Sequence, residues 1–425
     1  MYTRLRYLAE INPPVPVSVE KARDEYRSFV PMQAIGEDWS LDLAQQRRIS
    51  EMDSGYSYFE DGDIAVAKVT PCFENGKAVI MHGLTEGSGF GTTEVTVIRP
   101  KTDINTKYLF YVLVENGFKQ LGKAEMTGAG GLKRVPDRIF RNYPVRVLPR
   151  STQDSVVAYL DRETAAIGAF IADQEELIGL LRERRNATIT HAVSRGIDAA
   201  VGMKETGIES LGQVPEHWAV SRVASTVLSA KNGVWGVEPD GIHDLRCVRV
   251  ADFDRAGQRI HDHDVTFRHI PQAERSGRIL TRGNLLLEKS GGGDKSPVGF
   301  VVLYDRDEPA VASNFIARVE LRDGMEPRYW TYVHGSLYAR RVNSRSIKQS
   351  TGIQNLDQSS YFNEIVGIPP AGEQVEIADY LDRETVLLDD AAADAREAIE
   401  LSRERRGALI SAVLAGKIDV PEESS

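Results

Sequence analysis

Two long stretches of the chain share one pattern of apolar and polar positions, and the pattern predicts a helix in each. In residues 153–198 apolar side chains recur at alternating steps of three and four residues, the spacing of a coiled-coil seam. The seam positions are Val157, Leu160, Thr164, Ile167, Ile171, Gln174, Ile178 and Leu181. The second stretch, 374–419, keeps the pattern with smaller residues, Leu381, Thr385, Leu388, Ala392, Ala395 and Ile399. Because small side chains opposite larger ones let helices approach closely, we expect the two helices to pack on each other.

The two stretches are copies of one segment. Placed on each other at a constant offset of 221, 20 of their 46 positions are identical without a gap. Both contain YLDRET (159–164 and 380–385) and RERR (182–185 and 403–406). At 1.5 Å per residue such a helix is roughly 70 Å long, which suits a spacer. A repeat of this kind predicts that the chain is two copies of one unit.

Short strand-like runs precede each helix. In the first half they are DIAVAKV (63–69), KAVIM (77–81) and TEVTVIRP (93–100), followed by a helix-like stretch at 105–118. The offset of 221 also places Lys68 on Lys289 and Tyr108 on Tyr329. We therefore predict an α+β protein with two tandem domains of mixed strands and helices, each followed by a long helix. The predicted boundaries are 1–150 for the first domain, 151–199 for the central helix, 200–217 for a linker, 218–371 for the second domain, 372–419 for the C-terminal helix and 420–425 for a tail.

Charge is unevenly distributed along the chain. The net charge is −10, but the two helical stretches carry −3 and −5, and residues 1–152 and 218–373, which contain the predicted domains, together carry +2. A domain surface can therefore attract phosphate despite the acidic total. No apolar run is long enough to span a bilayer, the N-terminus lacks the apolar core of a signal peptide, and the two cysteines lie in different halves, so we expect a cytoplasmic protein without a membrane partner.

Basic loops at two matching strand ends are the strongest local chemistry. KVTPCFENGK (68–77) and KSGGGDKSPVG (289–299) place lysines and short polar side chains where loops contact phosphates and base edges. Residues 327–356 add bases with no acid among them. A polar turn or a solvated face is the alternative for each feature. The candidate DNA-contacting residues are Lys68, Thr70, Asn75, Lys77, Thr92, Thr93, Lys133, Arg134, Lys289, Ser290, Lys295, Arg341, Arg345 and Lys348.

Signals for catalysis are weak. NPPV (12–15) is similar to the tetrapeptide of amino-methyltransferases but lacks its aromatic residue and a preceding cofactor-binding loop. HDHD (261–264) has metal-ligating side chains, but adjacent residues on a polar loop seldom point at one ion, so we interpret it as surface. We predict no catalytic, cofactor-binding or metal-binding residue in this chain.

Together these features resemble the specificity subunits of type I restriction-modification systems. The resemblance covers nearly the whole chain and rests on DIAVAKVTPCFENGKAVI, GFGTTEVTVIRP, MKETGIESLGQVPEHW (203–218) and RRGALISAVLAGKID. The loop at 289–299 differs from the one at 68–77, which leaves the base-reading residues of the second domain less defined.

The resemblance implies two target-recognition domains, each reading half of a bipartite double-stranded DNA site. It implies that the helices form an antiparallel coiled coil that holds the domains apart and binds two methylation subunits, and through them restriction subunits. S-adenosylmethionine, ATP and magnesium would belong to those partners, which methylate adenine or restrict DNA, and none to this chain. The candidate partner-binding residues are Arg182, Arg184, Arg185, Arg403, Arg405 and Arg406, with salt bridges within the helices as the alternative.

Two other functions are the rivals. A DNA methyltransferase or nuclease would carry its own active site, and methyl transfer by the isolated chain would reveal it. A helical scaffold would bind only proteins, and failure of the chain with its partner subunits to retain DNA would reveal that.

Overall fold

The structure is a computed structural model that describes residues 1–52, 55–129, 131–350 and 352–420. Its internal contacts divide the chain into two compact units. The first unit contains Met1–Glu175 and the chain from Arg396, and the second contains Glu176–Ala395. Each unit thus holds one predicted domain and portions of both long helices. Of the predicted tail, residues 421–425 lie outside the described residues.

The first unit contains two four-stranded sheets. One has the order β2-β9-β6-β7, and the other has the order β4-β3-β8-β5 with β3 parallel to β8. Their bounds are β2 Ala9–Ile11, β9 Val95–Pro100, β6 Ile64–Ala67, β7 Ala78–Ile80, β4 Gln46–Arg48, β3 Tyr26–Val30, β8 Ser88–Gly91 and β5 Ser57–Glu60. Two further pairs are β1 (Tyr2–Arg4) with β12 (Pro144–Arg146) and the hairpin β10 (Thr127–Ala129) with β11 (Leu132–Arg134). The helical elements are α1 Leu5–Leu8, α2 Val17–Lys21, α3 Thr106–Val114, α4 Asn116–Ala124, α5 Asp137–Asn142 and the 3-10 turns η1 Met32–Ala34, η2 Ile49–Glu51 and η3 Thr85–Gly87.

The second unit repeats this arrangement. Its four-stranded sheets have the orders β16-β26-β22-β24 and β20-β17-β25-β21, again with one parallel pair, β17 and β25. Their bounds are β16 Val227–Asn232, β26 Ile316–Leu321, β22 Asn284–Glu288, β24 Val301–Tyr304, β20 Phe267–His269, β17 Asp244–Val248, β25 Ala310–Ala312 and β21 Ile279–Leu280. A three-stranded sheet joins β23 (Ser290–Gly291), β28 (Ile353–Leu356) and β27 (Ile347–Ser350). Residues 200–217, predicted as a linker, contain the pair β13 (Met203–Glu205) and β14 (Gln213–Pro215).

The remaining elements of the second unit are short, apart from one helix. The strand pairs are β15 (Ala219–Arg222) with β29 (Ile365–Ile368) and β18 (Phe253–Asp254) with β19 (Arg259–Ile260). The helical elements are α7 Gln272–Arg275, α8 Pro327–Ala339, α9 Gln358–Tyr361 and the 3-10 turns η4 Val223–Thr226, η5 Val250–Asp252 and η6 Val342–Ser346.

Equivalent strands in the two units share one register and one reason for being strands. Ile64 pairs with Ile98 in the first unit, and Leu285 pairs with Val319 in the second, both at the predicted offset of 221. Every residue of β6 and of β22 is buried, which explains why β6 is apolar throughout and β22 has three consecutive leucines rather than an alternating pattern. The two ends of β22, Asn284 and Glu288, are polar but also buried. Residues that the duplication makes equivalent therefore also have equivalent pairing partners in the sheets.

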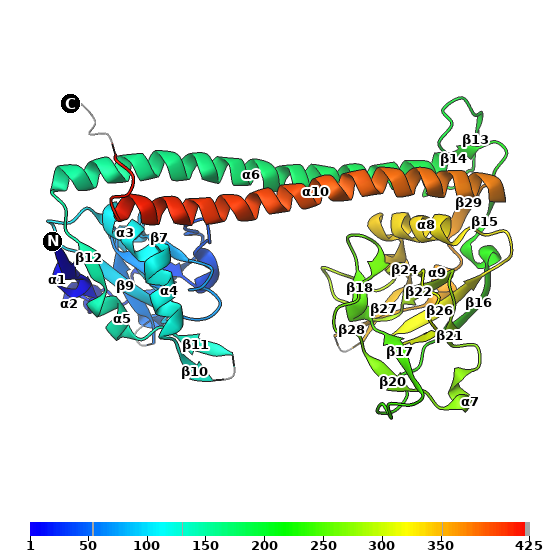
Figure 1. The fold of residues 1–425 in the computed structure, drawn as a ribbon, viewed down its shortest axis with the longest axis horizontal. Coiled ribbons are helices and arrows are strands. Elements are labelled where there is room, and N and C mark those ends of the chain that lie inside the picture. The colour runs from blue at the N-terminus through cyan, green and yellow to red at the C-terminus, as the bar shows by residue number, and fades with distance from the viewer. Residues whose placement is uncertain (53–54, 130, 351, 421–425) are drawn as a thin grey trace. The chain divides into compact units, whose positions relative to one another are not determined.

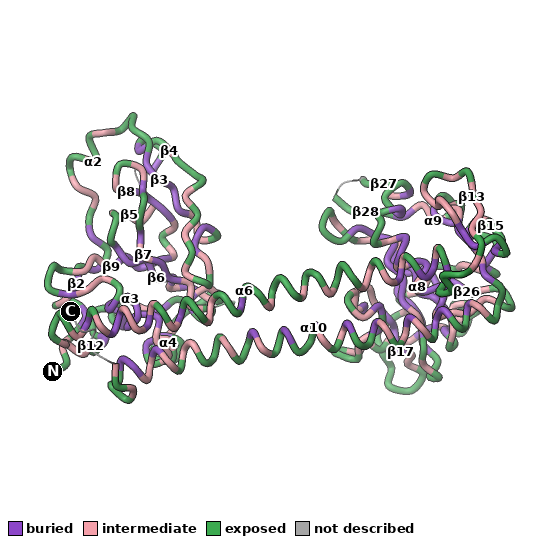
Figure 2. The backbone as a smooth tube through the Cα atoms, turned by 90° about the horizontal axis from the view of Figure 1, so that it is seen from above, coloured by how far each residue is buried: buried purple, intermediate pink, exposed green. Residues whose placement is uncertain are grey.

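The long helices are α6 (Arg150–Arg195) and α10 (Ala371–Leu414) (Figure 1). In the first unit Leu160 of α6 shares a core with Val413 of α10, whereas in the second unit Ile189 of α6 shares a core with Ile377 of α10. An early part of one helix thus meets a late part of the other in each unit, so the helices are antiparallel. The predicted seam of α10 is buried throughout, and Figure 2 shows buried and exposed residues alternating along its tube. The predicted fold class is confirmed.

The YLDRET motif fixes each helix to the domain that precedes it. The hydroxyl of Tyr111 in α3 donates to Asp161 at 2.7 Å, and the hydroxyl of Tyr332 in α8 donates to Asp382 at the same distance. The leucine before each aspartate is fully buried, and the threonine three residues after it lies within 3.3 Å of the same tyrosine hydroxyl. The duplicated motif is therefore a docking element.

Candidate nucleic-acid interface

In the first unit the loop after β6 and the hairpin β10–β11 form one polar surface. The Thr70 hydroxyl donates to the Gly131 carbonyl oxygen and accepts from the Lys133 backbone N–H, both at 2.9 Å. Val69 and Arg134 form an isolated bridge beside them. Lys133 and Arg134 are exposed, and the hairpin projects from the unit on the side away from the long helices (Figure 1). Two segments that are 61 residues apart in sequence at Thr70 and Gly131 thus form one surface, on which Lys133 and Arg134 are exposed.

Lys68 and the predicted threonines lie beside this surface. The Lys68 backbone N–H donates to the Glu94 carbonyl oxygen at 2.9 Å, and the Glu94 N–H donates to the Thr92 hydroxyl at 3.2 Å. The Glu94 carboxylate lies 3.3 Å from the Arg134 guanidinium. Thr93, between Thr92 and Glu94 in the sequence, is exposed. Sequence reasoning did not single out Glu94, although its place between a predicted threonine and a strand was a usable signal.

Two contacts fix the 68–77 loop to the rest of the first unit. Its Phe73 is 2% exposed and packs against α4, where a Cβ on Gly122 would come within 2.2 Å of the Phe73 ring. The Asn75 side-chain amide donates to the Glu37 carboxylate at 2.7 Å. Lys77 is half-buried at the end of the loop. The structure therefore gives Asn75 a protein partner within the first unit.

In the second unit the equivalent loop follows β22 and is tied to the equivalent hairpin, β27–β28. The Ser290 hydroxyl donates to the Asn355 side chain at 2.6 Å, and Lys289 reaches the Asn232 side chain at 2.5 Å. Partial burial lowers the pKa of Lys289 from its ordinary value. Lys295 is exposed farther along the loop. Phe315, which stands at the position of Glu94, is 47% exposed here and was not predicted.

The basic stretch 327–356 divides into core and surface. Its aromatic residues Tyr329 and Trp330 are fully buried, so they are not a platform for stacking bases. Arg341 and Arg345 are exposed, and the Arg341 guanidinium lies 6.0 Å from the Tyr338 ring centroid. The ammonium group of Lys348, in β27, lies 2.6 Å from the Asp357 carboxylate.

The two RERR motifs each divide in the same way. The last arginine of each contacts its own unit, because Arg185 lies 3.0 Å from the Asp389 carboxylate and Arg406 lies over the Trp39 ring at 4.6 Å. The other predicted partner-binding arginines, Arg182, Arg184, Arg403 and Arg405, are exposed. Of these only Arg403 has an ion pair among the described residues, with Glu175 and with Glu400. Leucines 180 and 401, two residues before each motif, are 55% and 57% exposed.

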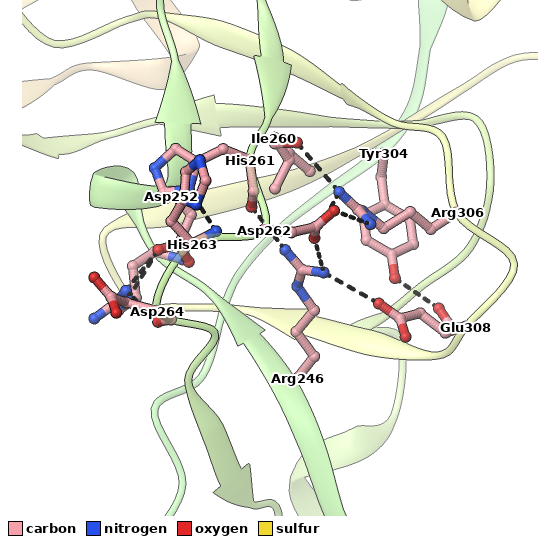
Figure 3. A network of polar contacts seen from close by, with 11 residues as sticks. Arg246, Asp252, Ile260, His261, Asp262, His263, Asp264, Tyr304, Arg306 and Glu308 are labelled. Carbon is pink, nitrogen blue, oxygen red and sulfur yellow. Dashed lines mark hydrogen bonds and ion pairs between the residues drawn. The ribbon is translucent and has the colours of Figure 1, made fainter.

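The HDHD stretch forms local structural contacts (Figure 3). The Asp262 carboxylate lies 2.8 Å from the guanidinium of Arg246, which is nearly buried, and 3.0 Å from that of Arg306. Nε2 of His261 lies 2.8 Å from a backbone oxygen. Asp262 thus balances two arginines, and the stretch stabilises its own loop.

A different group places metal-ligating atoms together. Ligand atoms of Asp240, Asp244 and His269 lie within 4.8 Å of one another. Asp240 Oδ2 is 2.9 Å from His269 Nδ1, and the Asp244 carboxylate accepts the backbone N–H groups of residues 240 and 241 at 3.0 and 2.7 Å. These hydrogen bonds and the Asp240–His269 contact explain why the three side chains lie close together. The absence of a metal site stays a prediction.

Comparison with known proteins identifies the relatives of this chain. No protein-family model matches it. It is 42% identical over 221 residues to the specificity subunit of the type I restriction enzyme EcoAI from Escherichia coli, covering 51% of this chain and 35% of that protein. The EcoEI specificity subunit from Escherichia coli is 32% identical over 233 residues, covering 54% and 36%. Over about half of its length the chain is similar to specificity subunits of type I restriction enzymes. It spans about a third of the length of these curated relatives.

A solved structure shares the fold over nearly the whole chain. A chain from a structure describing complex assembly and conformational transition of the type I R-M system has a TM-score of 0.66 at 16% identity, covering 97% of each chain. The resemblance to type I restriction specificity subunits that the sequence predicts is confirmed by the two curated relatives. Among the described helices none is long and apolar enough to cross a membrane.

Proposed function

We propose that this chain is the DNA specificity subunit of a type I restriction-modification complex and has no active site of its own. Its domains at 1–150 and 218–371 each read one half of a bipartite double-stranded DNA site. The observation that carries the proposal is the matched pair of surfaces: a loop opening with Lys68 or Lys289 lies against a hairpin at the same place in both units. The relatives are specificity subunits, which supports this role.

The chemistry of the surfaces suits DNA. Lysine and arginine bind phosphate in any sequence, while arginine and short polar side chains discriminate base edges in the major groove. Hairpin and loop are joined by side-chain hydrogen bonds, so these groups are held in place before DNA binds. Such pre-organisation reduces the entropy lost on binding.

The long helices supply the partner surface in this proposal. The exposed arginines of the RERR motifs and the exposed leucines at 180 and 401 occur at matching positions, as two equivalent methylation subunits require. Those partners would methylate adenine with S-adenosylmethionine after flipping the base, and restriction subunits would add ATP- and magnesium-dependent cleavage in the cytoplasm.

DNA retention and methyl transfer test this proposal together. The chain assembled with its methylation subunits should retain a DNA containing one bipartite sequence and methylate adenine there. The chain alone should transfer no methyl group. Methyl transfer by the isolated chain would show an enzyme instead, and an assembled complex that retains no DNA would show a scaffold.

A further inference from the structure

A buried carboxylate lies beside the candidate DNA loop of the second unit. Glu288 ends β22, is fully buried, and directly precedes Lys289. Its Oε2 lies 2.8 Å from Nη2 of Arg255, which lies in the turn between β18 and β19, and its Oε1 has no hydrogen-bond partner among the described residues. Because a buried carboxylate without a counter-ion is strongly unfavourable, this pair fixes the position of the arginine.

Two aromatic rings hold the same guanidinium. Arg255 Cζ lies 4.9 Å from the Phe300 ring centroid and 6.0 Å from that of Tyr338, and Nη1 lies 3.3 Å from the Tyr338 hydroxyl oxygen. Arg341, a predicted DNA contact, lies 6.0 Å from the same Tyr338 ring. The Arg255 side chain is 30% exposed. Since an arginine has five N–H groups, donors remain for a ligand.

The first unit shows what this arrangement replaces. There the Ala67 N–H donates to the Lys77 carbonyl oxygen at 3.0 Å, and in the second unit the Glu288 N–H donates to the Phe300 carbonyl oxygen at 2.8 Å. Lys77 and Phe300 therefore occupy the same register position. The second unit has the Phe300 ring at this position instead of a lysine, and the guanidinium of Arg255 lies over that ring.

We propose that Arg255 contacts DNA in the second domain and supplies there the positive charge that Lys77 supplies in the first, with Glu288 as its positioning residue. This inference rests on the proposed function. Domains that share one fold read different sequences only through different side chains, and this charge comes from a different loop in each. A fixed guanidinium offers paired donors to a guanine edge or a phosphate, which a lysine cannot match.

The experiment uses the full chain assembled with its methylation subunits and the DNA duplex that the wild-type complex retains, titrated at several salt concentrations. Arg255→Gln should weaken binding about tenfold and reduce the salt slope by about one, and Arg255→Lys should recover part of both. Arg259→Gln is the matched control, because Arg259 lies in the same hairpin, is 74% exposed and pairs with Asp254. It should bind as the wild type does.

A second variant distinguishes the loss of a DNA contact from misfolding. Arg255→Gln leaves the Glu288 carboxylate unpaired, so the double variant Arg255→Gln/Glu288→Gln, with two neutral amides, should melt near the wild-type temperature and still bind weakly. A DNA library randomised in one half-site at a time should show its changes in one half only. Affinity, salt slope and preference equal to those of Arg259→Gln would overturn the inference. A wild-type complex that retains no DNA would instead overturn the proposed function.

Discussion

The hydroxyl groups of Tyr111 and Tyr332 allow a quantitative test of how each long helix is fixed to its domain. Changing either tyrosine to phenylalanine removes one hydrogen bond to a carboxylate and keeps the ring. Hydrogen bonds to charged groups contribute about 1.5–3 kcal/mol to stability. The side chains of Asp161 and Asp382 are 37% and 42% exposed, so water screens them, and we expect the lower end, about 1.5 kcal/mol.

Neither change leaves a carboxylate without a counter-ion. Asp161 retains Lys107 at 2.6 Å, and Asp382 retains Arg328 at 2.7 Å. A loss much greater than the hydrogen bond is therefore not expected. For a unit of about 200 residues, about 1.5 kcal/mol corresponds to a melting temperature lower by roughly 3–6 °C.

Thermal unfolding followed by circular dichroism and calorimetry would measure this loss. Tyr159→Phe is the matched control, because Tyr159 belongs to the same YLDRET motif and its hydroxyl has no hydrogen bond among the described residues. If Tyr111→Phe and Tyr159→Phe melt at the same temperature, the motif does not dock the helix through this contact.

Three further results are expected. The double change Arg184→Glu and Arg405→Glu should reduce co-purification of methylation subunits. It should not lower the melting temperature, because both side chains are exposed and have no ion pair among the described residues. Unchanged co-purification would contradict a partner role. Burial lowers the pKa of His334 to about 4, so folding favours the neutral ring. As the pH falls from about 6.5 to about 4, the free energy of unfolding of the second unit should fall by on the order of 3 kcal/mol. Urea titrations should show a smaller loss in His334→Gln. Gly122→Ala should displace Phe73 and its loop, lower the stability of the first unit by roughly 1–3 kcal/mol and weaken DNA binding. DNA binding equal to that of the wild type would show that the position of the loop does not matter.

The helices and the duplication were predictable because they depend on spacing along the chain. The buried seam of α10 follows from a heptad pattern, and the offset of 221 fixed equivalent strands before any contact was known. The docking role of YLDRET was not predictable, since its partners Tyr111 and Tyr332 lie about 50 residues away and nothing local marks them.

The candidate site was predictable by region rather than by residue. The loops at Lys68 and Lys289 carry a local signal, lysines at a strand end, and the structure places both beside a hairpin. Their neighbours come from elsewhere in the sequence: Glu37 contacts the first loop, and Arg255 contacts the residue before the second. Such contacts depend on how separate loops fold together, which neither periodicity nor composition records.

Methylation mapping would show directly whether each domain reads its own half-site. The chain and its methylation subunits would be expressed in cells lacking other adenine methylation, and methylated sites would be read by sequencing for the wild type, for Lys133→Ala/Arg134→Ala in the first hairpin and for Lys348→Ala with Arg345→Ala beside the second. We expect one bipartite sequence for the wild type, with a loss or relaxation confined to one half for the first variant and to the other half for the second. Changes in the same half, or in both halves equally, would contradict the claim that each domain reads its own half-site.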